Sequence, residues 1–169
     1  MKNSIRQQFV KKAEGRNDLF TGKTKKGVLI CPVCYSIFYD KQWHHILKKD
    51  LKNIDFKNKE VKFQKCLADE MIEKGLHEGE LIIKNLSKKY EAEILHLITS
   101  FANKAKLRDS QDRIIKIQKQ KDGSYYITTT ENQLAVRIGK KIVSAHKKAQ
   151  IEIHHSEEPY EVSRVIVSF

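Results

Sequence analysis

Three cysteines and one aspartate are spaced like the ligands of a metal ion. Cys31 and Cys34 form a C-x-x-C pair. Cys66, the third and last cysteine of the chain, stands three residues before Asp69, where a second such pair would place its final sulfur. Zinc accepts carboxylate oxygen as well as thiolate sulfur, so these side chains can complete a tetrahedral site. The spacing therefore predicts zinc as a cofactor, with Cys31, Cys34, Cys66 and Asp69 as ligands.

This ligand set has alternatives. His44, His45 and His77 are rivals of Asp69, because imidazole is the commoner partner of three thiolates. The metal can also have been lost, which would leave the cysteines as small core residues. A redox C-x-x-C is typical of a helix N-terminus in a βαβ pattern. Here Cys34 is followed by Tyr-Ser-Ile-Phe-Tyr, a run that is typical of a strand, and this favours metal binding.

The predicted centre is structural in character. Catalytic zinc usually keeps a coordination position open for water, whereas here protein side chains fill all the positions. The chain also contains neither G-x-G-x-x-G nor G-x-x-x-x-G-K-[ST], and it lacks a nucleophile and base signature. We therefore expect a protein that is not an enzyme and has no small-molecule substrate.

Short elements must position these ligands. Residues 1–26 show no sustained period and predict a flexible basic arm. Residues 27–78 predict a small zinc-ribbon-like module, because strands at 28–30 and 36–39 flank the C-x-x-C turn. In the same module we expect an exposed loop or hairpin at 48–59, a strand at 61–65 and a short helix at 67–75 that ends at Gly75.

Residues 79–169 predict an α+β domain. Ser87 is the expected N-cap of a helix that runs to about residue 106, and Thr130 with Gln133 makes a capping box for a second helix to about residue 148. Strands are expected at 81–83, 113–119, 124–130, 150–154 and 162–169, with turns at Lys121-Asp122-Gly123 and Glu157-Glu158-Pro159. This order predicts a ferredoxin-like split βαβ domain with an extra C-terminal strand and both helices on one face of the sheet.

The chain is basic, and its charge is unevenly distributed. The net charge is +12, of which residues 1–26 carry +6, residues 27–78 carry +1 and residues 79–169 carry +5. Such an excess predicts an anionic partner, and nucleic acid is the usual one. The alternative is ordinary solvated charge of a lysine-rich protein.

The second predicted helix gathers cations largely opposite its apolar stripe, where they can follow phosphates. Tyr125, Tyr126 and Trp43 would offer stacking surfaces for bases if they are exposed, but core packing is the alternative for whichever tyrosine points inward. The expected RNA-binding residues are Arg137, Lys140, Lys141, Lys147 and Lys148 in this helix, with Lys11, Lys12, Arg16, Lys25 and Lys26 in the arm.

Two segments carry a family resemblance. CPVCYSIFYDKQW resembles the zinc-ribbon start, and TTTENQLAVRIGKKIVSAHKKAQIEIHHSEEPYEVSRVIV the end, of small bacterial proteins related to the nonsense-mediated decay protein three family. The match covers roughly residues 28–168 and is most specific at TTT-x3-LA-x-RIG. The family pattern has a second C-x-x-C, whose last position is Asp69 here, so it supports only Cys31, Cys34 and Cys66 as ligands. The best-known members resemble export and maturation adaptors of the large ribosomal subunit, which implies a ribosome or RNA partner.

The leading interpretation is a cytoplasmic RNA-binding protein that docks on the ribosome, as an assembly, quality-control or hibernation factor. A DNA-binding zinc-ribbon transcriptional regulator is the alternative, because zinc ribbons and basic arms serve both nucleic acids. A metal-dependent hydrolase is a third interpretation, supported only by scattered histidines. No apolar run approaches the roughly 20 residues that cross a bilayer, so no membrane partner is expected.

Overall fold

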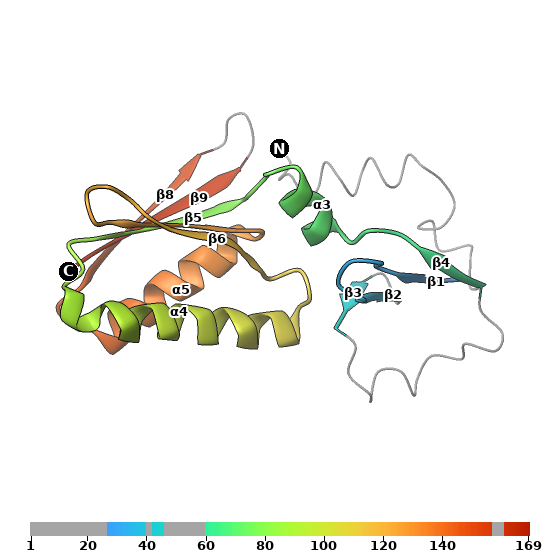
Figure 1. Ribbon diagram of the computed structural model, residues 1–169, viewed down its shortest axis with the longest axis horizontal. Coiled ribbons are helices and arrows are strands. Elements are labelled where there is room, and N and C mark those ends of the chain that lie inside the picture. The colour runs from blue at the N-terminus through green and yellow to red at the C-terminus, as the bar shows by residue number, and fades with distance from the viewer. Residues whose placement is uncertain (1–26, 40–41, 46–59, 157–160) are drawn as a thin grey trace.

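The computed structural model describes residues 27–39, 42–45, 60–156 and 161–169. This part of the chain is a mixed α+β structure with two sheets and three helices (Figure 1). The predicted arm, the predicted loop at 48–59 and the Glu157-Glu158-Pro159 turn lie outside the described residues. Among the described residues, no helix combines the length and apolar character needed to span a bilayer.

The first sheet belongs to an N-terminal module, which we define as β1 to β4 with helix α3. Its strand order is β3-β2-β1-β4, in which β1 pairs antiparallel with β2 and parallel with β4. The bounds are Gly27–Ile30 for β1, Ile37–Tyr39 for β2, Gln42–His44 for β3, Glu60–Phe63 for β4 and Leu67–Glu73 for α3. The elements expected around the cysteines are therefore present. Strand β3 was not expected, because three residues are too few to show an alternation.

The apolar core formed by the described residues of the N-terminal module is small. Val28 and Ile37 are buried and pack with Ile30 between the strands. A second cluster consists mainly of the cysteines with Ala68 and Trp43. A core of this size supplies little folding free energy, so we expect the module to need a further staple.

The second sheet belongs to a C-terminal module, which we define as β5 to β9 with helices α4 and α5. Its strand order is β6-β7-β5-β9-β8. The bounds are Gly79–Lys84 for β5, Ile114–Lys119 for β6, Tyr125–Thr129 for β7, Gln150–Ser156 for β8 and Val162–Ser168 for β9. The last strand is inserted between β5 and β8, parallel to β5. This interior position suits β9 because Val165 and Val167 are completely buried.

Helices α4 (Lys88–Arg108) and α5 (Asn132–Ala145) lie on the same side of this sheet (Figure 1). Their apolar stripes and the sheet enclose the main core, which includes Ile94, Ile98, Leu134, Ile138 and Ile142. The Ser87 side chain accepts a hydrogen bond from the Lys89 amide at 3.4 Å, so the expected N-cap of α4 is confirmed.

The expected start and end of α5 are both wrong. Its N-cap is Glu131, which makes no side-chain cap, and the Thr130 hydroxyl instead donates to the Gln111 carbonyl at 2.5 Å. The helix ends at Ala145 because the chain turns at His146, whose carbonyl accepts from the Ala149 amide. Lys147 and Lys148 therefore lie in the turn that follows α5. Tertiary bonds of Thr130 outweighed the local capping pattern.

Candidate metal centre

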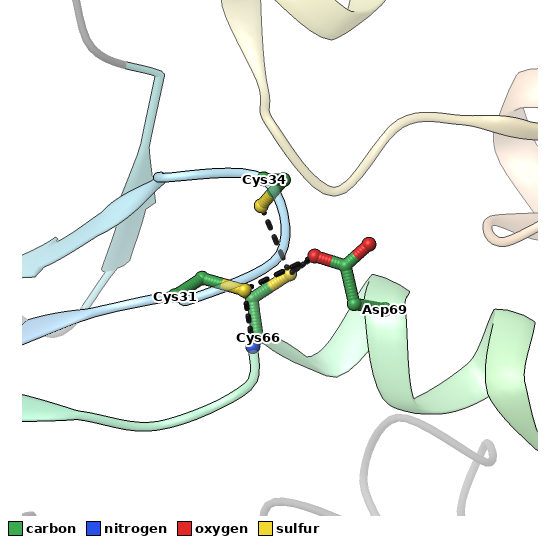
Figure 2. Close-up of side chains that lie close together, drawn as sticks. All are labelled: Cys31, Cys34, Cys66 and Asp69. Carbon is green, nitrogen blue, oxygen red and sulfur yellow. Dashed lines mark hydrogen bonds between the residues drawn. The ribbon is translucent and has the colours of Figure 1, made fainter.

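Two segments of the N-terminal module bring the predicted ligands together. Cys31 and Cys34 belong to the turn between β1 and β2, whereas Cys66 immediately precedes α3 and Asp69 lies in the first turn of that helix. The four side chains converge on one point (Figure 2). Their sulfur and oxygen atoms all lie within 4.8 Å of one another. This arrangement can hold a metal ion.

The turn that carries the first two cysteines is closed by backbone hydrogen bonds. The Cys31 amide donates to the Ser36 carbonyl at 2.9 Å, and the Tyr35 amide donates to the Cys31 carbonyl at 2.9 Å. Tyr35 has a φ of 60°, a left-handed conformation that disfavours residues other than glycine. The turn therefore holds both sulfurs on its inner side at some cost in backbone strain.

The distances fit a tetrahedral ion. Oδ2 of Asp69 lies 3.1 Å from the Cys31 sulfur and 3.0 Å from the Cys66 sulfur. The sulfurs of Cys34 and Cys66 are 3.6 Å apart. For metal–sulfur bonds of about 2.3 Å and metal–oxygen bonds of about 2.0 Å, a tetrahedron has edges of about 3.8 and 3.5 Å. These three distances are shorter than the tetrahedral edges, and all four ligand atoms lie within 4.8 Å of one another, so small movements of the side chains would accommodate such an ion.

The centre is largely withdrawn from solvent. Cys31 and Cys66 are completely buried, Asp69 is 7% exposed, and Cys34 is half-buried. A buried carboxylate among thiols needs a compensating charge or hydrogen bonds. The N-terminal module supplies the thiol hydrogen bonds, and the C-terminal module supplies the charge.

Arg113, just before β6, provides that charge. Its Nη1 donates to Oδ1 of Asp69 at 2.6 Å, and its Nη2 lies 3.5 Å from the Cys66 sulfur. Its Nε donates to the Ser110 carbonyl at 2.8 Å, which fixes the plane of the guanidinium. Arg113 is buried with Asp69, so this ion pair is shielded from water. The sequence offered no signal for Arg113, because it lies 44 residues from Asp69 in the chain.

Two neighbours of Arg113 also reach the N-terminal module. Oε1 of Gln111 accepts a hydrogen bond from the Ala68 amide at 3.0 Å, at the start of α3. The Ser110 hydroxyl donates to the Trp43 carbonyl at 3.1 Å. Both side chains are buried, although polar residues after a helix usually predict an exposed loop. Residues 109–113 form the loop between α4 and β6 of the C-terminal module, and their side chains contact the N-terminal module. We call this loop the connector.

The environment shifts the pKa values of the ligands. The hydrogen bond from Cys66 lowers the pKa of the Cys34 thiol to about 5, and the same bond, together with burial, raises the pKa of Cys66. Burial acts to raise the pKa of Asp69, but hydrogen bonds from the thiols and the charge of Arg113 outweigh it, so that pKa is lowered. The contact between these two sulfurs therefore favours loss of one thiol proton from the pair, which supplies an anionic sulfur ligand.

The rival histidines lie outside the ligand cluster. Among the described residues, the cluster contains no histidine. Nε2 of His77 forms a hydrogen bond with Oε1 of Glu80 at 3.0 Å instead. The redox alternative also lacks its expected setting, because Cys34 lies in a turn between two strands. All three cysteines are free thiols.

Comparison of the chain with protein-family models, with curated proteins and with solved structures found no match. The resemblance to the nonsense-mediated decay protein three family therefore stays a prediction, and function has to be inferred from the residues themselves.

Proposed function

We propose that this protein is a non-enzymatic, cytoplasmic RNA-binding protein that docks on the ribosome. The observation that carries the proposal is a group of lysines at the C-terminal end of α5. Lys140 and Lys141 are exposed on the helix, and Lys147 and Lys148 are exposed in the turn after it. Within the described part of the chain, no carboxylate forms an ion pair with any of them. Such cations are available to phosphates at little desolvation cost.

Arg137, the fifth predicted cation of this region, differs from these lysines. Its Nη2 donates to Oδ2 of Asp112 at 2.6 Å. This ion pair already neutralises its charge, so we expect Arg137 to contribute less to phosphate binding. The predicted contacts in the arm, namely Lys11, Lys12, Arg16, Lys25 and Lys26, lie outside the described residues.

The aromatic residues support a smaller role than the sequence suggested. Tyr125 is 5% exposed, so its ring belongs to the core and cannot stack on a base. Tyr126 points to the other face of the sheet, where its hydroxyl donates to Oε1 of Glu80 at 2.7 Å. Trp43 packs edge-on against Phe38 at 5.4 Å between ring centroids. We therefore propose that phosphate contacts outweigh base stacking.

We further propose that the metal is zinc and that its role is structural. Three thiolates with one carboxylate suit zinc better than a hard cation such as magnesium or calcium. The four protein ligands fill a tetrahedron, which leaves no position for a reactive water. A zinc ribbon and a ferredoxin-like domain are then the fold names that we propose for the two modules. The ribosome is named as the partner because of the family resemblance.

The RNA proposal is tested by sedimentation with ribosomes over a salt series. Replacing Lys140, Lys141, Lys147 and Lys148 by Ala should weaken co-sedimentation and flatten the logarithmic salt slope by about 0.7–0.9 for each phosphate that is no longer neutralised. Thermal unfolding should change little, because surface substitutions usually stay within about 0.5 kcal/mol.

The matched control removes the same charge from α4. It replaces Lys88, Lys89, Lys104 and Arg108, which are all exposed, by Ala. Equal weakening by both sets would mean that net charge alone attracts the ribosome, and no weakening by either would end the proposal. Competition by duplex DNA as strong as by ribosomal RNA would favour the transcriptional regulator.

A further inference from the structure

The connector at residues 109–113 is bonded in two directions. Toward the N-terminal module, Arg113 holds Asp69 and Gln111 accepts from the Ala68 amide. Toward the C-terminal module, the Arg113 amide donates to the Thr130 hydroxyl, and the Thr130 amide donates to the Arg113 carbonyl, both at 2.9 Å. Arg113 is therefore anchored firmly to one module while its guanidinium contacts a ligand of the other.

The carboxylate of Asp69 is suited to this contact because it has two oxygens. Oδ2 faces the sulfurs of Cys31 and Cys66, and Oδ1 accepts from Arg113 at 2.6 Å. One oxygen can thus coordinate the metal while the other is held by the C-terminal module. A cysteine at this position would offer only one sulfur atom, which could not bind the metal and Arg113 through two separate atoms.

Charge gives Arg113 a second effect on the centre. Three thiolates and a carboxylate outweigh the charge of a zinc ion, and the excess is negative and buried. Arg113 is 8% exposed and lies against both Asp69 and Cys66. Its guanidinium is the nearest cation that the structure describes at these ligands, so it offsets the excess where water cannot.

We propose that Arg113 is a positioning residue that couples zinc binding to the docking of the two modules. By binding Oδ1, it orients Asp69 so that Oδ2 can coordinate the metal. The bound metal in turn holds Asp69 in the position where its Oδ1 accepts the hydrogen bond from Arg113. Loss of zinc then loosens the contact between the N-terminal module and the connector. This inference rests on the zinc part of the proposed function and is independent of RNA binding.

The test is a double-mutant cycle on zinc release. The full chain is loaded with zinc, and transfer of the ion to a chromophoric chelator is timed for the parent, Arg113→Met, Asp69→Cys and the double variant. Arg113→Met should accelerate release at least about 10-fold in the parent background, as is typical when the hydrogen-bond partner of a metal ligand is removed. In the Asp69→Cys background, the same change should have less than about a third of that effect.

Arg108→Met serves as the matched control, because Arg108 is exposed at the end of α4, and it should leave release unchanged. Arg113→Lys replaces Arg113→Met in the cycle if the latter does not fold. It should give an intermediate rate of zinc release, because lysine keeps the positive charge but lacks the planar guanidinium that reaches Asp69 and Cys66 together. An equal acceleration by Arg113→Met in both backgrounds, or none in either, would overturn the proposal.

Hydrogen exchange gives a readout of docking that does not depend on release rates. Removing zinc from the parent should speed exchange of the Ala68 amide, which is bonded to Gln111 across the two modules. The amides of β5 should keep their protection. Unchanged exchange of the Ala68 amide would show that the contact between the two modules does not depend on bound metal, and it would overturn the proposed coupling. A parent that binds no zinc would refute the metal assignment together with the coupling, whereas failure to bind ribosomes would refute neither.

Discussion

Glu80 is a carboxylate whose neighbours keep it ionised although it is buried. It is 7% exposed on the sheet face opposite the helices. It accepts hydrogen bonds from the Tyr126 hydroxyl at 2.7 Å and from Nε of Arg164 at 2.6 Å, and it contacts His77. Burial acts to raise the pKa of Glu80, but these partners outweigh it, and the pKa lies below its ordinary value.

This shift predicts a pH-dependent contribution to stability. A group whose pKa is lowered on folding stabilises the folded state above its ordinary pKa, about 4.3 for glutamate, and the contribution is lost as the pH falls through the folded value. Glu80→Gln should therefore reduce the free energy of unfolding at pH 7 by about 1–3 kcal/mol. The deficit relative to the parent should shrink below about pH 4.

Urea unfolding of both proteins at pH 7 and pH 3 measures the difference, and loss of metal in acid affects the two alike. Glu152→Gln is the control, because Glu152 is 70% exposed beside His154 and should matter little at either pH. A Glu80→Gln deficit that stays constant over this range would contradict the assignment.

At the scale of elements, the approach of α5 to the sheet depends on one glycine. A Cβ atom added at Gly139 would lie 2.6 Å from Cγ1 of Val165 and 3.0 Å from Cδ1 of Ile151. Val165 is completely buried in β9, so it has little room to move away. Gly139 thus lets the helix backbone lie close to β9, at the expense of helix propensity.

Gly139→Ala should therefore destabilise the protein by about 1–3 kcal/mol through overpacking, although alanine favours helix. Denaturant unfolding monitored by circular dichroism measures this change. Ser144→Ala, at an exposed position of the same helix, should be neutral or slightly stabilising. If Gly139→Ala also raised the unfolding midpoint, the close packing of α5 on β9 would be refuted.

At the scale of the whole molecule, the two modules differ in the size of the apolar core that stabilises them. The C-terminal module encloses a continuous core of sixteen buried residues between helices and sheet. The described residues of the N-terminal module form two small clusters, one of them made largely of cysteines. For such a module, the free energy of metal binding is folding free energy.

Chelation of the metal, or Cys66→Ser, should therefore unfold residues 27–78 far more than residues 79–169. Hydrogen exchange resolved by segment, with elemental analysis of the purified protein, measures this outcome, and close to one equivalent of zinc is expected in the parent. Leu97→Ala, in α4 at the edge of the main core, should give the opposite pattern. A purified protein without zinc, or simultaneous loss of protection in both modules on chelation, would contradict the expectation.

Local sequence patterns predicted the type and order of most elements and the residues of the ligand cluster. Cys31, Cys34, Cys66 and Asp69 meet because each pair is closely spaced in the chain, and neighbouring strands bring the two pairs together. The strands and helices of residues 79–169 could be predicted in type and order because alternation with period two and the helical stripe depend on near neighbours. The alternation, the helical stripe and the spacing within each ligand pair are properties that a short window of residues contains.

Only the tertiary structure decided which distant residues complete these patterns. It placed Arg113 on Asp69, paired Arg137 with Asp112 and inserted β9 between β5 and β8. It also made the Thr130 hydroxyl a donor to the Gln111 carbonyl, in place of the helix N-cap that the local sequence predicted. The three side-chain contacts join residues that are 44, 25 and 19 positions apart, and β9 pairs with β5 from the far end of the module. The free energy of such contacts comes from removing paired charges and hydroxyls from water together, and no local spacing encodes which partner will be there.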